Sequence, residues 1–308
     1  MSEEILVSEK LTKRYSKHVA LDNVSISVRR NRIFGLLGPN GAGKTSLIRI
    51  INQITGPDEG AVFFNGETLS SKHIGKIGYL PEERGLYKKM KVGEQALYLA
   101  QLKGLTRKDA IDKLKYWFEK FEIETWWNKN VEDLSKGMQQ KVQFITTVLH
   151  EPELLIFDEP FSGFDPINKE QIKKEILFLR DNGASIIFST HNMESVEELC
   201  DDIALINNSK KILSGSVSDI QKAHKTNTFN IGFDGSAESF INSLKDKVII
   251  VELKEEKELI ATVKLNENIS LNNILSLLIP VVSITSCNEV IPSMRDVFID
   301  SVTKSETT

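Results

Sequence analysis

The first two thirds of the chain alternates short apolar runs with stretches of helical periodicity. Each apolar run ends at a glycine, proline, hydroxyl or acidic residue, as buried strands of a parallel sheet commonly do. We predict strands at 32–38, 60–66, 76–81, 153–159 and 185–190, helices starting at Lys44 and covering 92–121, 167–180 and 193–200, and a hairpin at 203–215. This order predicts a mixed α/β domain.

A different order follows the polar joint KAHKTNT at 222–228. The periodicity there predicts strands at 228–233, 248–253, 259–265 and 281–288, helices at 236–244 and 271–278, and a last helix at 293–302. This is the βαββαβ order of a ferredoxin-like domain. We therefore expect two domains, 1–224 and an accessory α+β domain at 225–308.

Composition narrows the class of protein. The 308 residues are 40% hydrophobic and 27% charged, with a formal net charge of -4, which is typical of a globular protein and does not favour nucleic-acid binding. Cys200 and Cys287 form no metal-binding motif, so buried thiols of a reducing compartment are the simplest interpretation. The N-terminus has no leader pattern, and the longest apolar stretch, from Ile274, is interrupted by Ser and Pro. If a membrane matters, we expect a partner to provide it.

The most specific motif is GPNGAGKT, between an apolar strand and a helix, which is the context of a phosphate-binding loop. Its glycines would let backbone amides point at a phosphate, Lys44 would bridge the β- and γ-phosphates, and Thr45 would bind Mg²⁺. A purely structural glycine turn is a poor competitor. The expected phosphate-binding residues are Gly38, Pro39, Asn40, Gly41, Ala42, Gly43, Lys44, Thr45 and Ser46.

Four further residues have weaker signals. Asp158 and Glu159 end the apolar strand LLIFDEP and suit Mg²⁺ binding and activation of water, although many strands end in acidic residues by chance. His191 follows another apolar strand and could reach a γ-phosphate, but a lone histidine is usually a surface or cap residue. Tyr15 could stack on adenine or simply belong to an edge strand.

The stretch LSKGMQQK starts at Leu134. Ser135 can cap a helix that opens at Gly137, which is an ordinary helix start. The residues alone do not explain why a glycine and a lysine lie beside the cap, 18 residues before the acidic strand that begins at Leu154.

In this order, the motifs resemble those of the ATPase subunit of ABC transporters, over roughly residues 4 to 220. Tyr15 matches the adenine-stacking aromatic residue, GPNGAGKT the Walker A motif, LSKGM the signature, Asp158 and Glu159 the Walker B pair, SGFD at 162–165 the D loop, and His191 the switch histidine. The resemblance implies a P-loop NTPase domain with a helical subdomain at about 85–150.

The resemblance also implies how the parts work. It implies that ATP and Mg²⁺ are bound, that Glu159 and His191 are catalytic, and that Thr45 and Asp158 bind the metal. Two subunits are expected to form a head-to-tail homodimer, in which Ser135 and Gly137 contact the γ-phosphate held by the other subunit. A hydroxyl, a glycine amide and a helix N-terminus can together bind an anion, so the resemblance implies that LSKGMQQK is half of an anion site completed in trans.

Three positions depart from the family pattern. Glu82 stands where the family has a glutamine that touches both Mg²⁺ and the membrane partner; it is a candidate metal ligand, but we favour a role toward the partner. Lys136 and Met138 replace the usual Gly and Gln of the signature. GYLPEERGLY and LSKGMQQKVQF look like the prokaryotic subgroup that pairs with ABC-2-type export permeases, including sodium and drug-efflux systems, and carries a C-terminal accessory domain.

We therefore expect an ATP-hydrolysing subunit that is cytoplasmic, lies on the inner face of the cell membrane and drives a separate permease, in the direction of export. Two alternatives remain at this stage. One is a soluble ABC ATPase of DNA repair or translation, against which the single cassette argues. The other is a nucleotide-gated scaffold with little turnover, which Glu82 and Met138 favour and Glu159 and His191 oppose.

Overall fold

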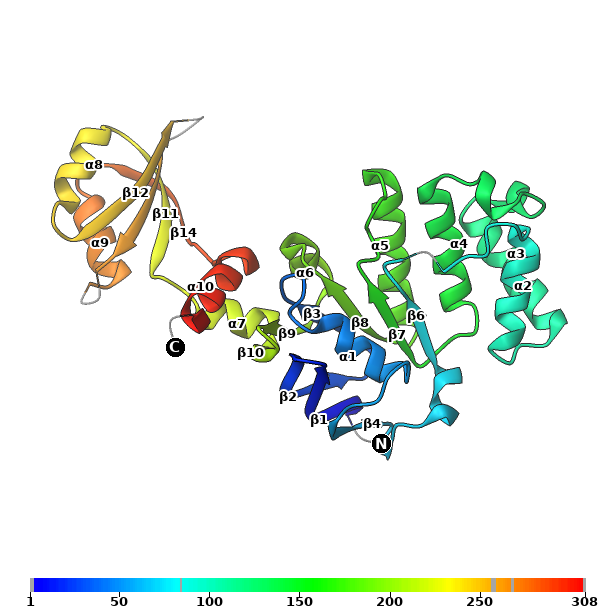
Figure 1. Ribbon diagram of the computed structural model, residues 1–308. Coiled ribbons are helices and arrows are strands. Elements are labelled where there is room, and N and C mark those ends of the chain that lie inside the picture. Colours follow the sequence, from blue (N-terminus) through cyan, green and yellow to red (C-terminus); the bar gives the residue numbers. More distant parts are fainter. Residues whose placement is uncertain (1–2, 84, 256–258, 267–268, 307–308) are drawn as a thin grey trace. The chain divides into compact units, whose positions relative to one another are not determined.

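The computed structural model describes residues 3–83, 85–255, 259–266 and 269–306, and the chain divides into two units (Figure 1). The first unit runs to Val217 and includes the end of the chain from Asp300, whereas the second is Ser218–Ile299. The division therefore differs from the boundary expected after residue 224. The last helix α10 (Met294–Glu306) ends in the first unit, where the Asn207 side-chain amide donates to the Ser305 hydroxyl at 3.1 Å.

Two sheets form the first unit. The antiparallel sheet has the order β2-β1-β4-β5, with β1 at Glu4–Tyr15, β2 at His18–Arg29, β4 at Glu59–Phe64 and β5 at Glu67–Thr68. The larger sheet has the order β10-β9-β3-β8-β7-β6, with β3 at Ile33–Leu37, β6 at Ile77–Leu80, β7 at Leu154–Asp158, β8 at Ser185–Thr190, β9 at Asp202–Asn207 and β10 at Lys210–Ser216. Only the β9–β10 pair of the larger sheet is antiparallel among the described strands.

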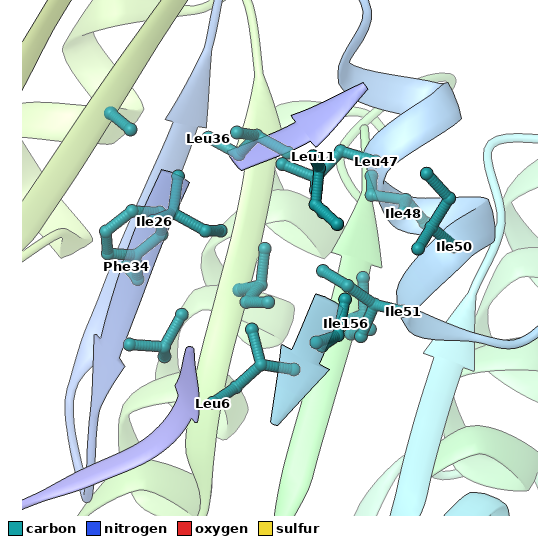
Figure 2. Packing of buried hydrophobic residues seen from close by; sticks show 14 of the residues in the cluster. Leu6, Leu11, Ile26, Phe34, Leu36, Leu47, Ile48, Ile50, Ile51 and Ile156 are labelled. Carbon is teal, nitrogen blue, oxygen red and sulfur yellow. The ribbon is translucent and has the colours of Figure 1, made fainter. Parts of the chain in front are cut away.

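One apolar cluster joins the two sheets to helix α1 (Lys44–Ile51). Figure 2 shows side chains of β1, β3 and α1 together in this cluster. Leu36, Leu47 and Ile48 are all fully buried, and burial of each such side chain contributes about 1.5 to 3 kcal/mol relative to exposure. The packing holds the loop between β3 and α1 against a rigid base.

A helical segment lies between β6 and β7 in sequence. It contains α2 (Val92–Leu102), α3 (Arg107–Lys120) and α4 (Lys136–Val148), with short 3₁₀ turns at Glu124–Trp126 and Val131–Asp133. Its aromatic core continues into the sheet, because Phe144 of α4 contacts Trp117 of α3 and stacks on Phe157 of β7 at 5.6 Å. The helix that carries the LSKGM stretch is therefore packed directly onto the strand that ends at Asp158.

The remaining helices of the first unit flank the parallel strands. They are α5 (Pro166–Asp181) and α6 (Met193–Leu199), with a 3₁₀ turn at Ser71–Lys76, while α7 (Val217–Ala223) begins at the junction with the second unit. None of the helices that the structure describes combines the length and the apolarity needed to cross a bilayer.

The second unit has the predicted βαββαβ order. It consists of β11 (Thr228–Asp234), α8 (Ala237–Leu244), β12 (Val248–Glu255), β13 (Leu259–Leu265), α9 (Leu271–Leu278) and β14 (Ser283–Glu289). The antiparallel sheet has the order β12-β13-β11-β14. Phe233 and Phe240, stacked at 4.2 Å, anchor α8 to β11 in a core of its own. This confirms the predicted fold class, an α/β domain of P-loop type plus a small α+β domain.

Candidate nucleotide-binding site

The carboxyl ends of four neighbouring strands converge at one edge of the parallel sheet. The order β3-β8-β7-β6 places the residues that follow each strand next to one another, although they come from distant parts of the sequence. In open α/β sheets, ligands bind at this edge. The four loops begin at Gly38, His191, Glu159 and Pro81.

The loop between β3 and α1 approaches other backbone so closely that two positions require glycine. Gly38 has φ +148° and Gly43 has φ +118°. A Cβ atom on Gly38 would lie 2.2 Å from the Ile206 carbonyl oxygen, and one on Gly43 would lie 2.3 Å from the Ala20 carbonyl oxygen. The loop is therefore held in a tightly curled shape, in which backbone amides can face an anion.

Lys44 lies at the start of α1 with only 7% of its surface exposed. Its ammonium group donates to the carbonyl oxygens of Gly38 at 2.7 Å and Pro39 at 3.1 Å. Burial lowers the pKa of Lys44, and the carboxylates of Glu159 and Asp158 oppose that shift. A buried cation that faces acidic side chains across a small space is suited to a polyphosphate.

Glu159 and His191 contact each other directly. One carboxylate oxygen of Glu159 accepts from the His191 backbone N–H at 2.9 Å and lies 2.6 Å from the imidazole Nδ1. The other oxygen accepts from the Thr190 hydroxyl at 3.2 Å. Since both oxygens have partners, the carboxylate is held in one orientation. Glu159 also has a left-handed backbone, with φ +49°, which turns the chain sharply after β7.

Asp158 is the buried member of the acidic pair, with 5% of its surface exposed. Burial raises the pKa of Asp158, and the negative charges of Glu82 and Glu159 add to the increase. A dication would relieve both effects, because it stabilises the ionised carboxylate. A threonine hydroxyl and carboxylates are oxygen donors of the kind that Mg²⁺ prefers, so Thr45, Asp158 and Glu82 fit this metal.

A cavity of about 250 Å³ joins these groups. The predicted residues that line it are Tyr15, Asn40, Gly41, Gly43, Lys44, Thr45, Ser46, Glu82, Asp158, Glu159 and His191, and His18 and Ala20 line it as well. Gly38, Pro39 and Ala42 do not line the cavity; they belong to the backbone of the same loop. Tyr15 lies at the end of β1 with 41% of its surface exposed, as a stacking residue requires.

Ser135 and Gly137 do not line this cavity either, and unlike Gly38, Pro39 and Ala42 they lie outside the phosphate-binding loop. Ser135 is the N-cap of α4, where its hydroxyl accepts from the Met138 amide at 3.3 Å. The ordinary function of a helix cap is therefore present. A contact with nucleotide would have to involve a different copy of the cavity.

Two buried glutamines of α4, which the sequence analysis did not identify, hold loops of the site. Gln140 donates to the Pro160 carbonyl oxygen at 3.0 Å, directly after Glu159. Gln143 lies within 3.4 Å of the Pro81 carbonyl oxygen and 3.3 Å of that of Glu83, on either side of Glu82. The signal that could have identified them is their position on the apolar face of an amphipathic helix.

A strand, a glycine loop and a helix follow one another here, and acidic residues end a nearby strand of the same sheet. This arrangement defines a nucleoside-triphosphate-binding protein of the P-loop class. Comparisons with known proteins specify this class. Residues 21–162 match the family model for ABC transporters, and residues 215–302 match the model for the C-terminal domain of ATP-binding proteins like DrrA1-3.

Individual proteins agree with the family models. The chain is 40% identical to the ABC transporter ATP-binding protein YhaQ of Bacillus subtilis (strain 168), over 97% of this chain and 98% of that protein. It is 34% identical to the Nod factor export ATP-binding protein I of Ralstonia nicotianae, over 76% of this chain and 72% of that protein. A solved ATP-binding subunit of an ABC transporter superposes with a TM-score of 0.67 at 30% identity, covering 71% of this chain and 92% of that one.

The chain thus belongs to the ATP-binding proteins of ABC transporters. It is the ATP-binding and ATP-hydrolysing subunit, and it powers a separate membrane permease.

Proposed function

We propose that the cavity binds Mg-ATP and that Glu159 and His191 are the catalytic residues. The loop amides and Lys44 would hold the β- and γ-phosphates, and Tyr15 would stack on adenine. Thr45 and Asp158 would hold Mg²⁺, with Glu82 as a further candidate ligand; when bound, the metal neutralises charge on the phosphates. The observation that best supports this assignment is the oriented carboxylate of Glu159, which lines the same cavity as Lys44.

In this proposal the side chains promote ATP hydrolysis by positioning the attacking water and by stabilising the charge that develops on the γ-phosphate. Glu159 is placed to polarise the attacking water, because Thr190 and the His191 backbone fix its carboxylate. The His191 side chain is 69% exposed, so it can reach a γ-phosphate and donate to it as charge develops. Lys44, desolvated and close to the phosphates, stabilises the same charge.

Replacement of the catalytic carboxylate tests this assignment. Glu159→Gln should lower ATP turnover by about 10² or more, because the water loses its base, while ATP affinity should change little because the phosphate loop is intact. Steady-state hydrolysis and equilibrium binding of a fluorescent ATP analogue provide the two measurements. Glu119→Gln, on the exposed surface of α3, is the matched control. Wild-type turnover in Glu159→Gln would contradict the assignment.

We further propose that two copies form a head-to-tail dimer around two ATP molecules. The support is that Ser135 and Gly137 lie outside the cavity of their own chain, although their helix N-terminus suits a phosphate. Glu159→Gln should accumulate as a dimer in the presence of Mg-ATP, measured by light scattering after size exclusion. Ser135→Arg in the same background should restore the monomer, and a persistent dimer in that double variant would exclude this geometry.

We propose an ABC-2-type exporter as the membrane partner, with this subunit on the cytoplasmic face. The support is the relative named for Nod factor export and the match of the second unit to DrrA-like C-terminal domains. Purification of the tagged chain from detergent-solubilised membranes of its native cell, followed by mass spectrometry, tests the proposal. Recovery of an importer permease in stoichiometric amount would contradict it.

A further inference from the structure

The turn between β9 and β10 contains two residues with left-handed backbones. Lys210 pairs with Asn207, so Asn208 and Ser209 form the turn between the strands. Asn208 has φ +45° and Ser209 has φ +68°. Two-residue turns of this kind need positive φ at both positions, and glycine is favoured at the second. A serine there is strained, so an observed serine points to a function of its side chain.

Ser209 contacts two separate parts of the nucleotide-binding site, and only 7% of its surface is exposed. Its backbone N–H donates to the Ala42 carbonyl oxygen, in the phosphate-binding loop, at 3.2 Å. Its hydroxyl donates to the Val19 carbonyl oxygen at 2.5 Å, and its own carbonyl oxygen accepts from the Asp22 N–H at 2.8 Å. Ser209 therefore joins the phosphate-binding loop to β2, which it holds on both sides of Ala20.

The start of β2 forms the side of the cavity where Tyr15 lies. Tyr15 pairs with His18 across the β1–β2 hairpin, and both residues line the cavity together with Ala20. Val19 lies between the two lining residues of β2, so the position of its carbonyl group determines where both of them lie. The Val19 residue itself is 39% exposed. The hydrogen bond from the buried Ser209 hydroxyl is therefore a fixed point for this segment.

We propose that Ser209 is a positioning residue for nucleotide binding. Its hydroxyl fixes the start of β2, and with it the nucleoside side of the cavity, relative to the phosphate-binding loop. This inference rests on the proposed Mg-ATP site, in which Tyr15 stacks on adenine. The backbone N–H that holds Ala42 remains in every substitution except proline, whereas the hydroxyl bond is lost with the side chain. Loss of the hydroxyl therefore weakens recognition of the nucleoside and spares recognition of the phosphates.

A purely structural role in the hairpin makes a different prediction, and glycine separates the two. Glycine adopts φ +68° without strain but has no hydroxyl, whereas alanine lacks the hydroxyl and keeps the strain. If Ser209 served the turn alone, Ser209→Gly would bind nucleotide as well as wild type does. If the hydroxyl positions β2, Ser209→Gly and Ser209→Ala lose affinity to a similar extent.

Equilibrium binding to the full chain tests the proposal. Both variants should raise the dissociation constant for Mg-ADP about three- to tenfold in titration calorimetry, as expected for the loss of one hydrogen bond. Inorganic tripolyphosphate has phosphates but no nucleoside, so its affinity in competition with Mg-ADP should stay within about twofold of wild type. Ser214→Ala, on the exposed surface of β10, is the matched control and should bind both compounds as wild type does.

Steady-state kinetics provides a second, independent measurement. In both variants the KM for ATP should rise about three- to tenfold, while kcat stays within about twofold, because the contacts of Glu159 with Thr190 and His191 are unchanged. A lower kcat at unchanged KM would overturn the proposal.

The binding measurements have two further outcomes that would overturn the proposal. One is wild-type affinity for Mg-ADP in Ser209→Gly, which would leave Ser209 as a residue of the turn alone. The other is an equal loss of affinity for Mg-ADP and tripolyphosphate, which would show that the whole site is disturbed. A wild-type chain that binds no Mg-ADP would instead contradict the proposed function, so the two failures can be told apart.

Discussion

Glu82 is an exposed acidic residue of the nucleotide cavity, at a position where the resemblance to the family predicts a glutamine. It lines the same space as Lys44 and Asp158, yet it is exposed, whereas Asp158 is buried. An exposed carboxylate is screened by water and salt, so its effect on a bound metal is smaller than its position suggests. Gln143 holds the backbone on both sides of it, which fixes where the side chain begins.

We predict that Glu82→Gln changes the isolated subunit little but changes its response to the permease. The Mg²⁺ concentration for half-maximal ATPase activity should stay within about twofold of wild type, because Asp158 and Thr45 remain. Stimulation by permease-containing membranes should change. Glu83→Gln, the exposed neighbour, is the control. A several-fold shift of the Mg²⁺ midpoint in the isolated subunit would instead make Glu82 a metal ligand.

The buried side chain of His150 makes the free energy of unfolding depend on pH. Burial lowers the pKa of His150 to about 4, and repulsion from Lys103 contributes to the decrease. Between pH 6.5 and pH 4 the unfolded chain therefore binds more protons at this position than the folded protein does. The stability contributed by neutral His150 is complete above pH 6.5 and is lost as the pH falls toward 4.

We predict that His150→Leu reduces the acid sensitivity of folding. Wild type should lose on the order of 1 to 2 kcal/mol of unfolding free energy from this residue between pH 7.5 and pH 5. Urea unfolding at the two pH values measures the difference for each protein. Since any cavity or packing effect of leucine is present at both pH values, it cancels. Equal losses in wild type and His150→Leu would show that His150 does not titrate in this range.

At the scale of elements, α4 links the two sides of the nucleotide site. Its N-terminus carries Ser135, Gln140 holds the loop after Glu159, and Gln143 holds the loop around Glu82. A rigid helix that contacts three loops can pass a displacement at one loop to the others. The family resemblance assigns a role only to its N-terminus.

We predict that Gln143→Met slows hydrolysis without weakening nucleotide binding. Methionine has a similar volume but cannot donate to the Pro81 and Glu83 carbonyl oxygens, so about 1 kcal/mol per lost hydrogen bond is removed from the loop. ATPase activity should fall about fivefold or more, while ATP affinity stays within about twofold. Gln101→Met, on the exposed surface of α2, is the matched control. Equal ATPase activity of Gln143→Met and Gln101→Met would contradict the inference that α4 links the loops of the nucleotide site.

Elements with strong local signals were predictable, and contacts between elements were not. The phosphate-binding loop could be predicted from GPNGAGKT because glycine, lysine and threonine each have a separate physical role there. The bounds of β13 and α9 agree with the predicted ones because the apolar periodicity of both segments is regular. Gln140, Gln143 and Thr190 were missed because a polar residue becomes functional only through the loop that packs against it. Likewise, no local pattern shows that the end of α10 belongs to the first unit.

At the scale of the whole molecule, the chain leaves the first unit at Val217 and its last residues, from Asp300, return to it. The second unit is therefore an insertion rather than a simple C-terminal extension. Truncation before the second unit removes not only that unit but also the part of α10 that packs with the first, including the contact of Ser305 with Asn207.

We predict that a chain ending at Val217 still binds ATP but is less stable. The cavity residues all precede this position, so ATP affinity should remain within about twofold. Loss of the α10 segment should lower the melting temperature by at least about 2 to 4 °C, which corresponds to about 1 kcal/mol for a unit of this size. Asn207→Ala in the full chain is the partial equivalent and should show a smaller decrease. A folded truncated chain that cannot bind ATP would contradict this division of roles.

The aromatic cluster of the helical segment makes this subunit a natural fluorescent reporter. The three tryptophans of the chain are Trp117, Trp126 and Trp127, and all five tyrosines precede Trp117. Trp117 contacts Phe144, which stacks on Phe157 immediately before Asp158. Tryptophan emission therefore reports on the surroundings of α3 and α4, and these helices pack against Phe157, the residue before the acidic pair. The second unit, Ser218–Ile299, contains no tryptophan and contributes no such signal. Nucleotide titrations can thus be followed without any label, and unfolding of the second unit requires a different probe.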